Sequence, residues 1–337
     1  MKKNIISLSM ALALSFCAFL SGCACSDNSQ LAFNLALETE KLTYTVEYSE
    51  HYVDSYKKDP TVTADFNYGK GIYVTECQKV TDRSAITSDI KESLNEMDIY
   101  KYTSDFGIDI QYTVGDKTYS HRETISTLIY LAPSGMSLAP LYATENAEYV
   151  MFADGDSGAQ ASILKSQTET FYNKSEYVQS KKYQYFKPDD EIAFTDATDT
   201  ENKENYTFRS TIDNAELYLA MRGLSIAENA STVMSVVSPS FKDPSKLKIT
   251  NNGRTSETFD IEYNGTALSE SISYVDLSFR LSDVNASGKT QNVFIQADGT
   301  ANLPNLKIPL KFAKPLFLYG NIKTMGCLVF TISEIER

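Results

Sequence analysis

From residue 42 onward, apolar and polar residues alternate one by one in many short segments of the chain. In residues 42–48 and 106–114, β-branched and aromatic residues occupy every second position, apart from a few small ones. Side chains of a β-strand point alternately to the two faces of a sheet, so this period of two places one row in a core and the other in water. The pattern excludes a mainly helical fold, because an amphipathic helix repeats about every 3.6 residues.

The same pattern predicts further antiparallel strands, with turn residues between them. Gly115 and Asp116 tolerate a positive φ and predict a hairpin turn. The other predicted strands span residues 71–75, 124–131, 148–152, 161–172, 182–186, 247–250, 258–263, 273–281, 292–297, 307–312 and 326–332.

Two segments follow a helical period instead. Asp213 and Glu216 form a capping-box pattern at the start of a predicted helix over residues 213–224, which Gly223 ends. Residues 84–97 carry an apolar stripe at spacings of three and four, formed by Ile86, Ile90, Leu94 and Met97.

Strands with two helices among them predict a β-dominated α+β fold, in which a curved antiparallel sheet or half-barrel packs on one or two helices. Residues 31–187 form a β-rich region with one helix, and residues 206–337 a helix followed by antiparallel strands. The acidic segment 188–205 between them is nearly free of apolar residues and predicts an exposed loop or boundary. Whether the chain forms one domain or two stays open.

The first residues have the pattern of a bacterial secretory signal. Lys2 and Lys3 precede an apolar stretch that is short for a membrane span. The stretch ends in Leu20, Ser21, Gly22 and Cys23, which resembles the lipobox of bacterial lipoproteins.

The lipobox resemblance implies cleavage after residue 22 and a lipid such as palmitate on Cys23. It also implies a protein anchored to the extracytoplasmic face of the cell membrane, with residues 23–30 as a tether. An ordinary signal peptide and an uncleaved anchor remain the alternatives.

The charge of the chain excludes some partners. The formal net charge is −13, and loss of Lys2 and Lys3 with the signal, without loss of any acidic residue, makes it −15. So acidic a protein is repelled by nucleic acid and by anionic lipid. We therefore expect no nucleic-acid partner, and lipid chains must hold the protein at the membrane.

Sequence motifs of catalysis and metal binding are weak. His51 and His121 are the only histidines, and no Gly-x-Ser-x-Gly elbow supplies a nucleophile for either of them. Residues 154–158 hold Asp154 and Asp156 but lack the later ligands of a calcium loop, so a turn is expected there. A second acidic cluster is formed by Asp196, Asp199 and Glu201, and it is expected to be a solvated loop. We therefore expect no enzyme, no metal and no cofactor.

The cysteines are odd in number once the signal is removed. Cys25, Cys77 and Cys327 remain besides the lipidated Cys23. An odd count is untypical of a disulfide framework, so free buried thiols are expected, with pairing of Cys77 and Cys327 left open.

Residues 211–224, together with the strands that follow them to residue 332, resemble the LolA/LprG-like half-barrel superfamily of bacterial lipoproteins and lipid carriers. The resemblance covers about a third of the chain. It implies a curved sheet with a concave face, and it says little about function.

Two hypotheses of function follow. In the first, a non-catalytic lipoprotein binds an apolar or amphipathic ligand such as a lipid in a pocket of the sheet. The residues predicted to line it are Tyr44, Val46, Tyr48, Ile108, Ile110 and Tyr112. In the second, the core is filled, for example by packing on the 84–97 helix, and the protein is a structural or protein-interaction lipoprotein of the cell envelope with unidentified partners. A large apolar cavity would favour the first.

We predict that Cys23→Ala abolishes lipidation, because the thiol is the acceptor of the lipid. The variant should stay in the aqueous phase in detergent partitioning and lack the mass shift of the wild-type protein. Partitioning of the variant into detergent with an unchanged mass shift would contradict the lipobox assignment.

Overall fold

A computed structural model describes residues 39–53, 56–86, 98–134, 137–155, 158–173, 176–205, 211–238, 244–281, 291–318 and 323–337. The predicted signal segment, the predicted lipobox residues Leu20, Ser21 and Gly22, the predicted acceptor Cys23 and the predicted tether lie outside the described residues. Residues 87–97 of the first predicted helix lie outside them too. At the start of that predicted helix, the structure describes a 3-10 turn, Arg83–Ala85.

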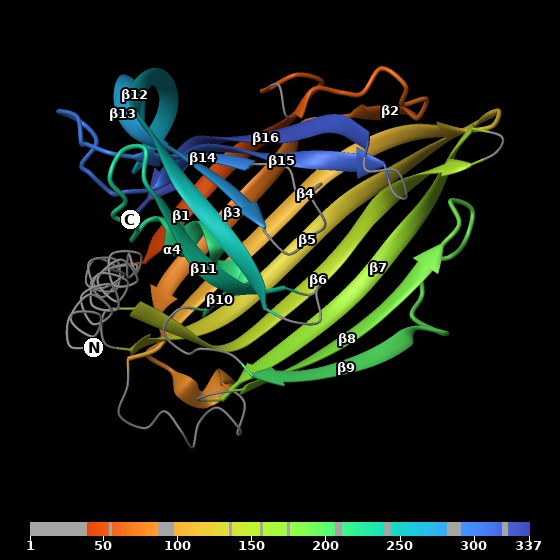
Figure 1. Cartoon of the computed structure of the whole chain (residues 1–337), viewed down its shortest axis with the longest axis horizontal. Helices are drawn as coiled ribbons and strands as arrows, with labels where there is room; N and C mark the ends of the chain where they lie inside the picture. Colours follow the sequence, from red (N-terminus) through yellow and green to blue (C-terminus); the bar gives the residue numbers. More distant parts are fainter. Residues whose placement is uncertain are drawn as a thin grey trace, which may run out of the picture.

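One sheet of sixteen strands accounts for most of the described chain (Figure 1). The strand order is β10-β11-β12-β13-β14-β15-β16-β1-β3-β4-β5-β6-β7-β8-β9, and β2 pairs with β4. The strands are β1 (Glu40–Ser49), β2 (Asp65–Tyr68), β3 (Gly71–Lys79), β4 (Tyr100–Val114), β5 (Lys117–Ser134), β6 (Ser137–Gly155), β7 (Gly158–Tyr172), β8 (Glu176–Phe186), β9 (Thr198–Asn205), β10 (Thr211–Asp213), β11 (Ser231–Val237), β12 (Ser245–Tyr263), β13 (Thr266–Leu281), β14 (Gln291–Gln296), β15 (Pro309–Leu318) and β16 (Lys323–Glu336).

The sheet curves strongly and is barrel-like. Neighbouring strands pair antiparallel, except that β10 pairs parallel with β11. A second parallel contact joins β12 to β16, at Glu262 with Glu334 and Tyr263 with Ile335. This contact closes β12 to β16 into a ring of five strands, while β3 to β9 extend away from it as one curved wing (Figure 1). The prediction of a β-dominated fold with a curved antiparallel sheet is confirmed.

The two halves of the chain meet at β1, which lies in the sheet between β3 and β16. A buried ion cluster fixes this junction. The carboxylate of Glu40 accepts hydrogen bonds from Arg222, with 3.0 Å between Nη2 and Oε2, and from Arg337 Nε at 3.1 Å. Burial alone would raise the pKa of Glu40, but the two guanidinium groups more than offset it and hold the pKa below its usual value.

The two regions predicted on either side of residues 188–205 therefore share one continuous sheet. The prediction of a loop over that whole segment is wrong for its second half, because Thr198–Asn205 forms β9 and pairs with β8. β9 is an edge strand whose residues are mostly exposed, so it has no buried row to produce the alternation. Its charged side chains are typical of edges that resist pairing with another chain.

The helical part of the fold is small. The capping box is present as predicted: Asp213 accepts from the amide of Ala215, and Glu216 accepts from the amide of Asp213. It begins a 3-10 turn, Asn214–Glu216, followed by α4, Leu217–Met221. This short helix packs on the inner face of the sheet, so the fold is less clearly α+β than the sequence predicts. Among the described residues, no helix is both long enough and apolar enough to cross a membrane.

Both described cysteines are buried free thiols, Cys77 in β3 and Cys327 in β16. Burial raises the pKa of Cys77 to about 12 and that of Cys327 to about 11. The protonated thiols therefore serve as small apolar core residues.

We predict that Asp213→Ala lowers the free energy of unfolding by about 1 kcal/mol, because it removes the acceptor for the amide of Ala215. Asp213→Asn keeps an acceptor and should cost less. Urea denaturation measures both. Equal midpoints for the wild type and the Ala variant would show that the capping interaction contributes nothing.

Candidate functional site

The six side chains predicted to line an apolar pocket pack into the core. Tyr44, Val46 and Ile108 belong to the main core cluster, and Ile110 and Tyr112 to a second one. All five are at most 2% exposed. The sixth, Tyr48, is half-buried, and its hydroxyl donates to the carbonyl of Met325 at 2.8 Å.

Their partners come largely from the C-terminal strands. The ring of Tyr44 packs against Phe312, with 5.4 Å between centroids, and its hydroxyl donates to the carbonyl of Pro309 at 2.9 Å. The void beside Tyr44 and Tyr218 measures only about 10 Å³, too small for an organic ligand. Among the described residues these side chains pack into the core, and the filled-core alternative describes them. The sequence could not show this, because the pairing of β1 with β16 brings Phe312 and Phe330 onto them.

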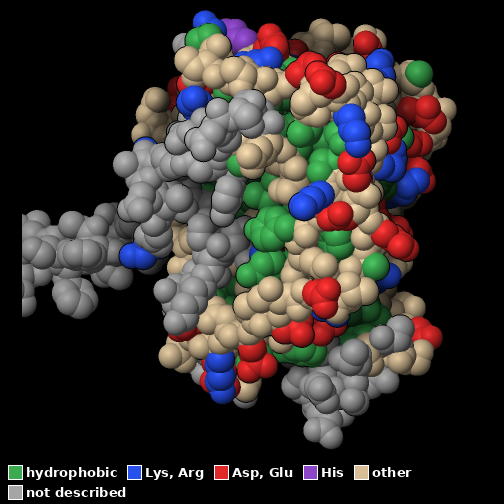
Figure 2. Space-filling model, turned by 90° about the vertical axis from the view of Figure 1, so that its right-hand side faces the viewer, with side chains coloured by type: hydrophobic (Ala, Val, Ile, Leu, Met, Phe, Trp, Pro, Cys, Tyr) green, Lys and Arg blue, Asp and Glu red, His purple; other side chains and the backbone are tan. Residues whose placement is uncertain are grey.

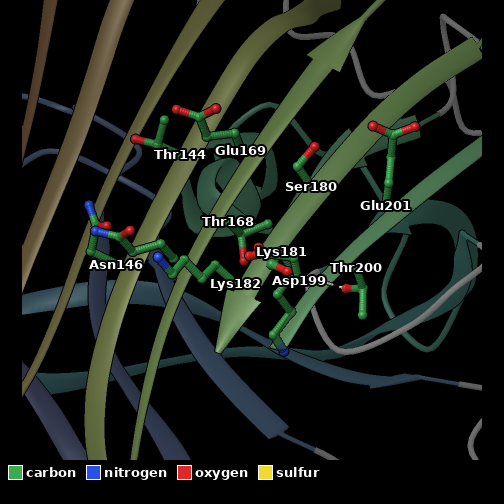
Figure 3. A pocket seen from close by; sticks show the side chains of 11 residues that line it. Thr144, Asn146, Thr168, Glu169, Ser180, Lys181, Lys182, Asp199, Thr200 and Glu201 are labelled. Atoms are coloured by element: carbon green, nitrogen blue, oxygen red, sulfur yellow. Dashed lines mark hydrogen bonds between the residues drawn. The ribbon is translucent and has the colours of Figure 1, made fainter. Parts of the chain in front are cut away.

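A polar groove of about 670 Å³ lies over β6, β7, β8 and β9 (Figure 3). It is lined by Thr144, Asn146, Gln167, Thr168, Glu169, Ser180, Lys181, Lys182, Asp199, Thr200 and Glu201. In the close view, Lys182 extends toward Asn146, and Glu169 lies beside Thr144. We call this the outer groove.

The strand register explains why these residues meet. Residues directly opposite each other on neighbouring strands point to the same face of a sheet. Pairing therefore builds one continuous row across five strands: Ser126 of β5, Asn146 of β6, Gln167 of β7, Lys182 of β8 and Asp199 of β9. We call it the amide row. A second row beside it consists of Leu128, Thr144, Glu169, Ser180 and Glu201.

The outer groove lies on the opposite face of the sheet from the small helix. Ile129 and Ala143 alternate with the groove residues along β5 and β6, so they point to the other face. There they pack against Leu219 of α4. The groove face is thus left uncovered by α4.

Aromatic side chains border the groove at both ends. Tyr142 and Phe171 are a cross-strand pair two residues from Thr144 and Glu169, with ring centroids 4.9 Å apart. The hydroxyl of Tyr142 donates to Glu169 at 3.2 Å. Desolvation and then the charge of Glu169 raise the pKa of Tyr142 to about 12, so the hydroxyl stays a donor. Toward the other end, the ring of Phe194 lies under the ammonium groups of Lys182 at 5.2 Å and Lys165 at 5.5 Å.

A smaller hollow of about 200 Å³ continues the groove onto β5. It shares Asn146 and Gln167 with the outer groove and includes Thr124 and Ser126. An ion pair between Lys165 and Glu148, 3.2 Å from Nζ to Oε2, lies at its border. The polar surface therefore runs without a break from β5 to β9.

Charges of both signs lie over the outer groove, and its middle is neutral. Asn146, Gln167 and Ser180 are exposed, and within the described part of the chain their side chains have no protein hydrogen-bond partner. Their amide and hydroxyl groups can both donate and accept. Rigid strands thus present unused hydrogen-bonding groups in fixed positions.

The sequence missed most of this site. Asp199 and Glu201 were expected in a solvated loop with Asp196, but they belong to β9 and the groove rows. Asn146 and Gln167 are 21 residues apart, and only the register joins them. One signal was present: residues 165–169 are polar at every position, which is unusual for an inner strand with one buried face.

Of the remaining sequence candidates, His121 lies on β5 and Asp154 near the end of β6. His121 Nε2 lies 3.5 Å from Glu148 Oε1, and burial lowers the pKa of His121 against the opposing effect of that carboxylate. Gly155 pairs with Gly158, so the predicted turn near Asp154 joins β6 and β7, while Asp156 lies outside the described residues. Over the described ranges, no three His, Cys, Asp or Glu side chains are grouped to hold a metal ion.

A buried carboxyl marks the place where β5 and β6 part. The pairing of these two strands ends at Thr124 and Glu148. Beyond it, the side chain of Glu123 accepts a hydrogen bond from the backbone amide of Val150 at 3.0 Å. The hydroxyl of Tyr68 lies 3.4 Å from the same oxygen. Burial raises the pKa of Glu123 to about 7.

The raised pKa of Glu123 predicts a pH-dependent stability. The folded protein holds this proton more tightly than the unfolded chain, whose value is 4.5. The stability that protonated Glu123 contributes is therefore fully present below about pH 4.5 and is lost as the pH rises through about 7. Glu123→Gln should flatten the fall in unfolding free energy between pH 5 and pH 8, measured by urea denaturation. Asp109→Asn, in an exposed ion pair with Arg122, is the control and should leave the slope unchanged. A variant slope equal to that of the wild type would contradict the prediction.

Comparisons with known proteins place the chain near few others. No protein-family model and no curated protein matches the sequence. Among solved structures, the chain is similar to a beta-barrel-like protein of domain of unknown function DUF1849 from Brucella abortus, with a TM-score of 0.37 and 5% sequence identity. The similarity covers 88% of this chain and 96% of that one.

Proposed function

We propose that the protein is a lipid-anchored, extracytoplasmic binding protein of the bacterial envelope that holds a polar partner in its outer groove and does no chemistry on it. This is the interaction hypothesis, with a filled core, in place of carriage of an apolar ligand. The lipobox at Cys23 supports the anchor and the location.

The observation that carries the proposal is the amide row. Five polar side chains on five adjacent strands face the same way, and the groove over them has the volume of a ligand site. Side chains on paired strands are held more rigidly than those on loops, which lowers the entropy lost on binding.

The filled core supports the choice of a polar partner. A carrier of apolar molecules needs a dry cavity of several hundred Å³. The side chains predicted to line such a cavity are instead packed in two core clusters, and Tyr44, Val46 and Ile108 share theirs with Phe312 and Phe330. The groove lining contains no histidine and no cysteine, so it lacks the residues of a Ser–His or Cys–His nucleophile pair.

The test uses the full-length lipoprotein in detergent and detergent-extracted wall fragments of the producing bacterium. We expect saturable co-sedimentation with the fragments, because the groove would face the envelope. The double variant Asn146→Ala/Gln167→Ala removes the centre of the amide row and should weaken binding by about tenfold or more.

A matched control is available in the same sheet. Asn67 of β2 and Gln111 of β4 are also an exposed cross-strand amide pair, but they lie outside the groove. Asn67→Ala/Gln111→Ala should bind like the wild type. Absence of saturable binding, or equal loss in both double variants, would remove the proposed function.

A further inference from the structure

We infer that the occupant of the outer groove is an extended, uncharged glycan chain that crosses β5 to β9 along the amide row. The inference rests on the proposed function and specifies the chemistry of the partner. Three properties of the described residues carry it: the spacing of the row, its charge and the aromatic pair beside it.

The spacing of the row suits a sugar chain. Neighbouring strands lie about 4.8 Å apart, so the row from Ser126 to Asp199 spans roughly 19 Å at right angles to the strands. One sugar ring of an extended chain covers a distance comparable to one strand spacing. Each ring would therefore meet one polar side chain of the row, with Asn146 and Gln167 at the centre.

A peptide fits this geometry less well. An extended peptide advances about 3.4 Å per residue, out of step with the strands when it lies across them. Peptides that bind sheets usually pair with an edge strand instead. The free edge here is β9, whose eight residues include Asp199, Glu201, Lys203 and Glu204, and such charges oppose pairing.

The charge pattern favours a neutral chain. Lys182 stands among Glu169, Asp199 and Glu201, while the centre of the groove consists of amides and hydroxyls. A polyanion would meet the three carboxylates, and a polycation would meet Lys181, Lys182 and, next to them, Lys165. Sugar hydroxyls donate and accept at once, which matches the side chains of Asn146, Gln167 and Ser180.

The aromatic pair supplies the apolar part of sugar recognition. One face of a sugar ring consists of C–H groups and packs on aromatic rings. Tyr142 and Phe171 are half-buried and lie on the groove face next to Glu169. Together with the amide row they form a surface with an apolar platform beside fixed polar groups.

The experiment compares two preparations of the wall fragments, one untreated and one stripped of protein by protease and hot detergent. We expect the full-length lipoprotein to bind both equally well. Binding only to the untreated fragments would show that the partner is a protein, which overturns the glycan inference and leaves the proposed function standing. Binding to neither would remove both.

A second measurement uses soluble probes, namely oligosaccharides released from the stripped fragments by glycosidase digestion and separated by length. Affinity, measured by calorimetry, should rise with length until the chain spans the five strands and then stay constant. Single sugars that bind as tightly as long chains would contradict the inference.

Variants connect the affinity to the two surfaces. Gln167→Ala should weaken binding of the long oligosaccharides by about tenfold, through loss of hydrogen bonds. Phe171→Leu keeps an apolar side chain but removes the ring, so it should weaken binding with little change in the urea midpoint. The Asn67→Ala/Gln111→Ala control should bind normally. Unchanged affinity in both groove variants would overturn the inference.

Discussion

The pairing of β1 with β16 is the contact on which the rest of the structure depends. It joins a sheet built from the first half of the chain to one built from the second half, from Lys41 opposite Glu336 to Ser49 opposite Cys327. The buried carboxylate of Glu40, held by Arg222 and Arg337, lies at the start of this seam. Removing one partner of such a buried pair leaves an uncompensated charge, so the cluster fixes the position of the seam.

On the face of the molecule shown in Figure 2, hydrophobic side chains gather in the middle and acidic side chains lie around them.

Much of this fold was predictable from local sequence. Alternation marked the long strands that have one buried face, and the Asp213 capping box marked the only described α-helix. The strands β2, β9, β10 and β11 were missed. β2 and β10 have few residues and β9 has no buried row, whereas β11 was missed although its residues alternate in burial. Alternation shows that Tyr44 or Ile110 faces inward, but not whether it meets a ligand or another strand. Two partners of Tyr44, Pro309 and Phe312, lie more than 260 residues away along the chain.

The candidate site depends on register in the same way. Asn146, Gln167 and Lys182 carry no motif, and each alone resembles an ordinary surface residue. A shift of one residue between β6 and β7 would turn Gln167 to the opposite face and break the row. Composition still informs the choice of partner, since a chain of net charge −13 is expected to repel polyanions. Function on such a sheet is therefore carried by the alignment of common side chains, which sequence patterns record poorly.

The seam also has a consequence for the order in which the chain acquires its structure. Lys41 and Glu336 are 295 residues apart, so β1 has to wait for β16 before both of its edges are paired. Contacts this distant in sequence slow folding, because a large loop must close before they form. During synthesis, β1 and β3 would be complete long before their C-terminal neighbours emerge. Until β16 is available, β1 would have an unpaired edge, although it lies at the centre of the finished sheet. Unpaired strand edges promote aggregation, so protection from aggregation matters most during this interval.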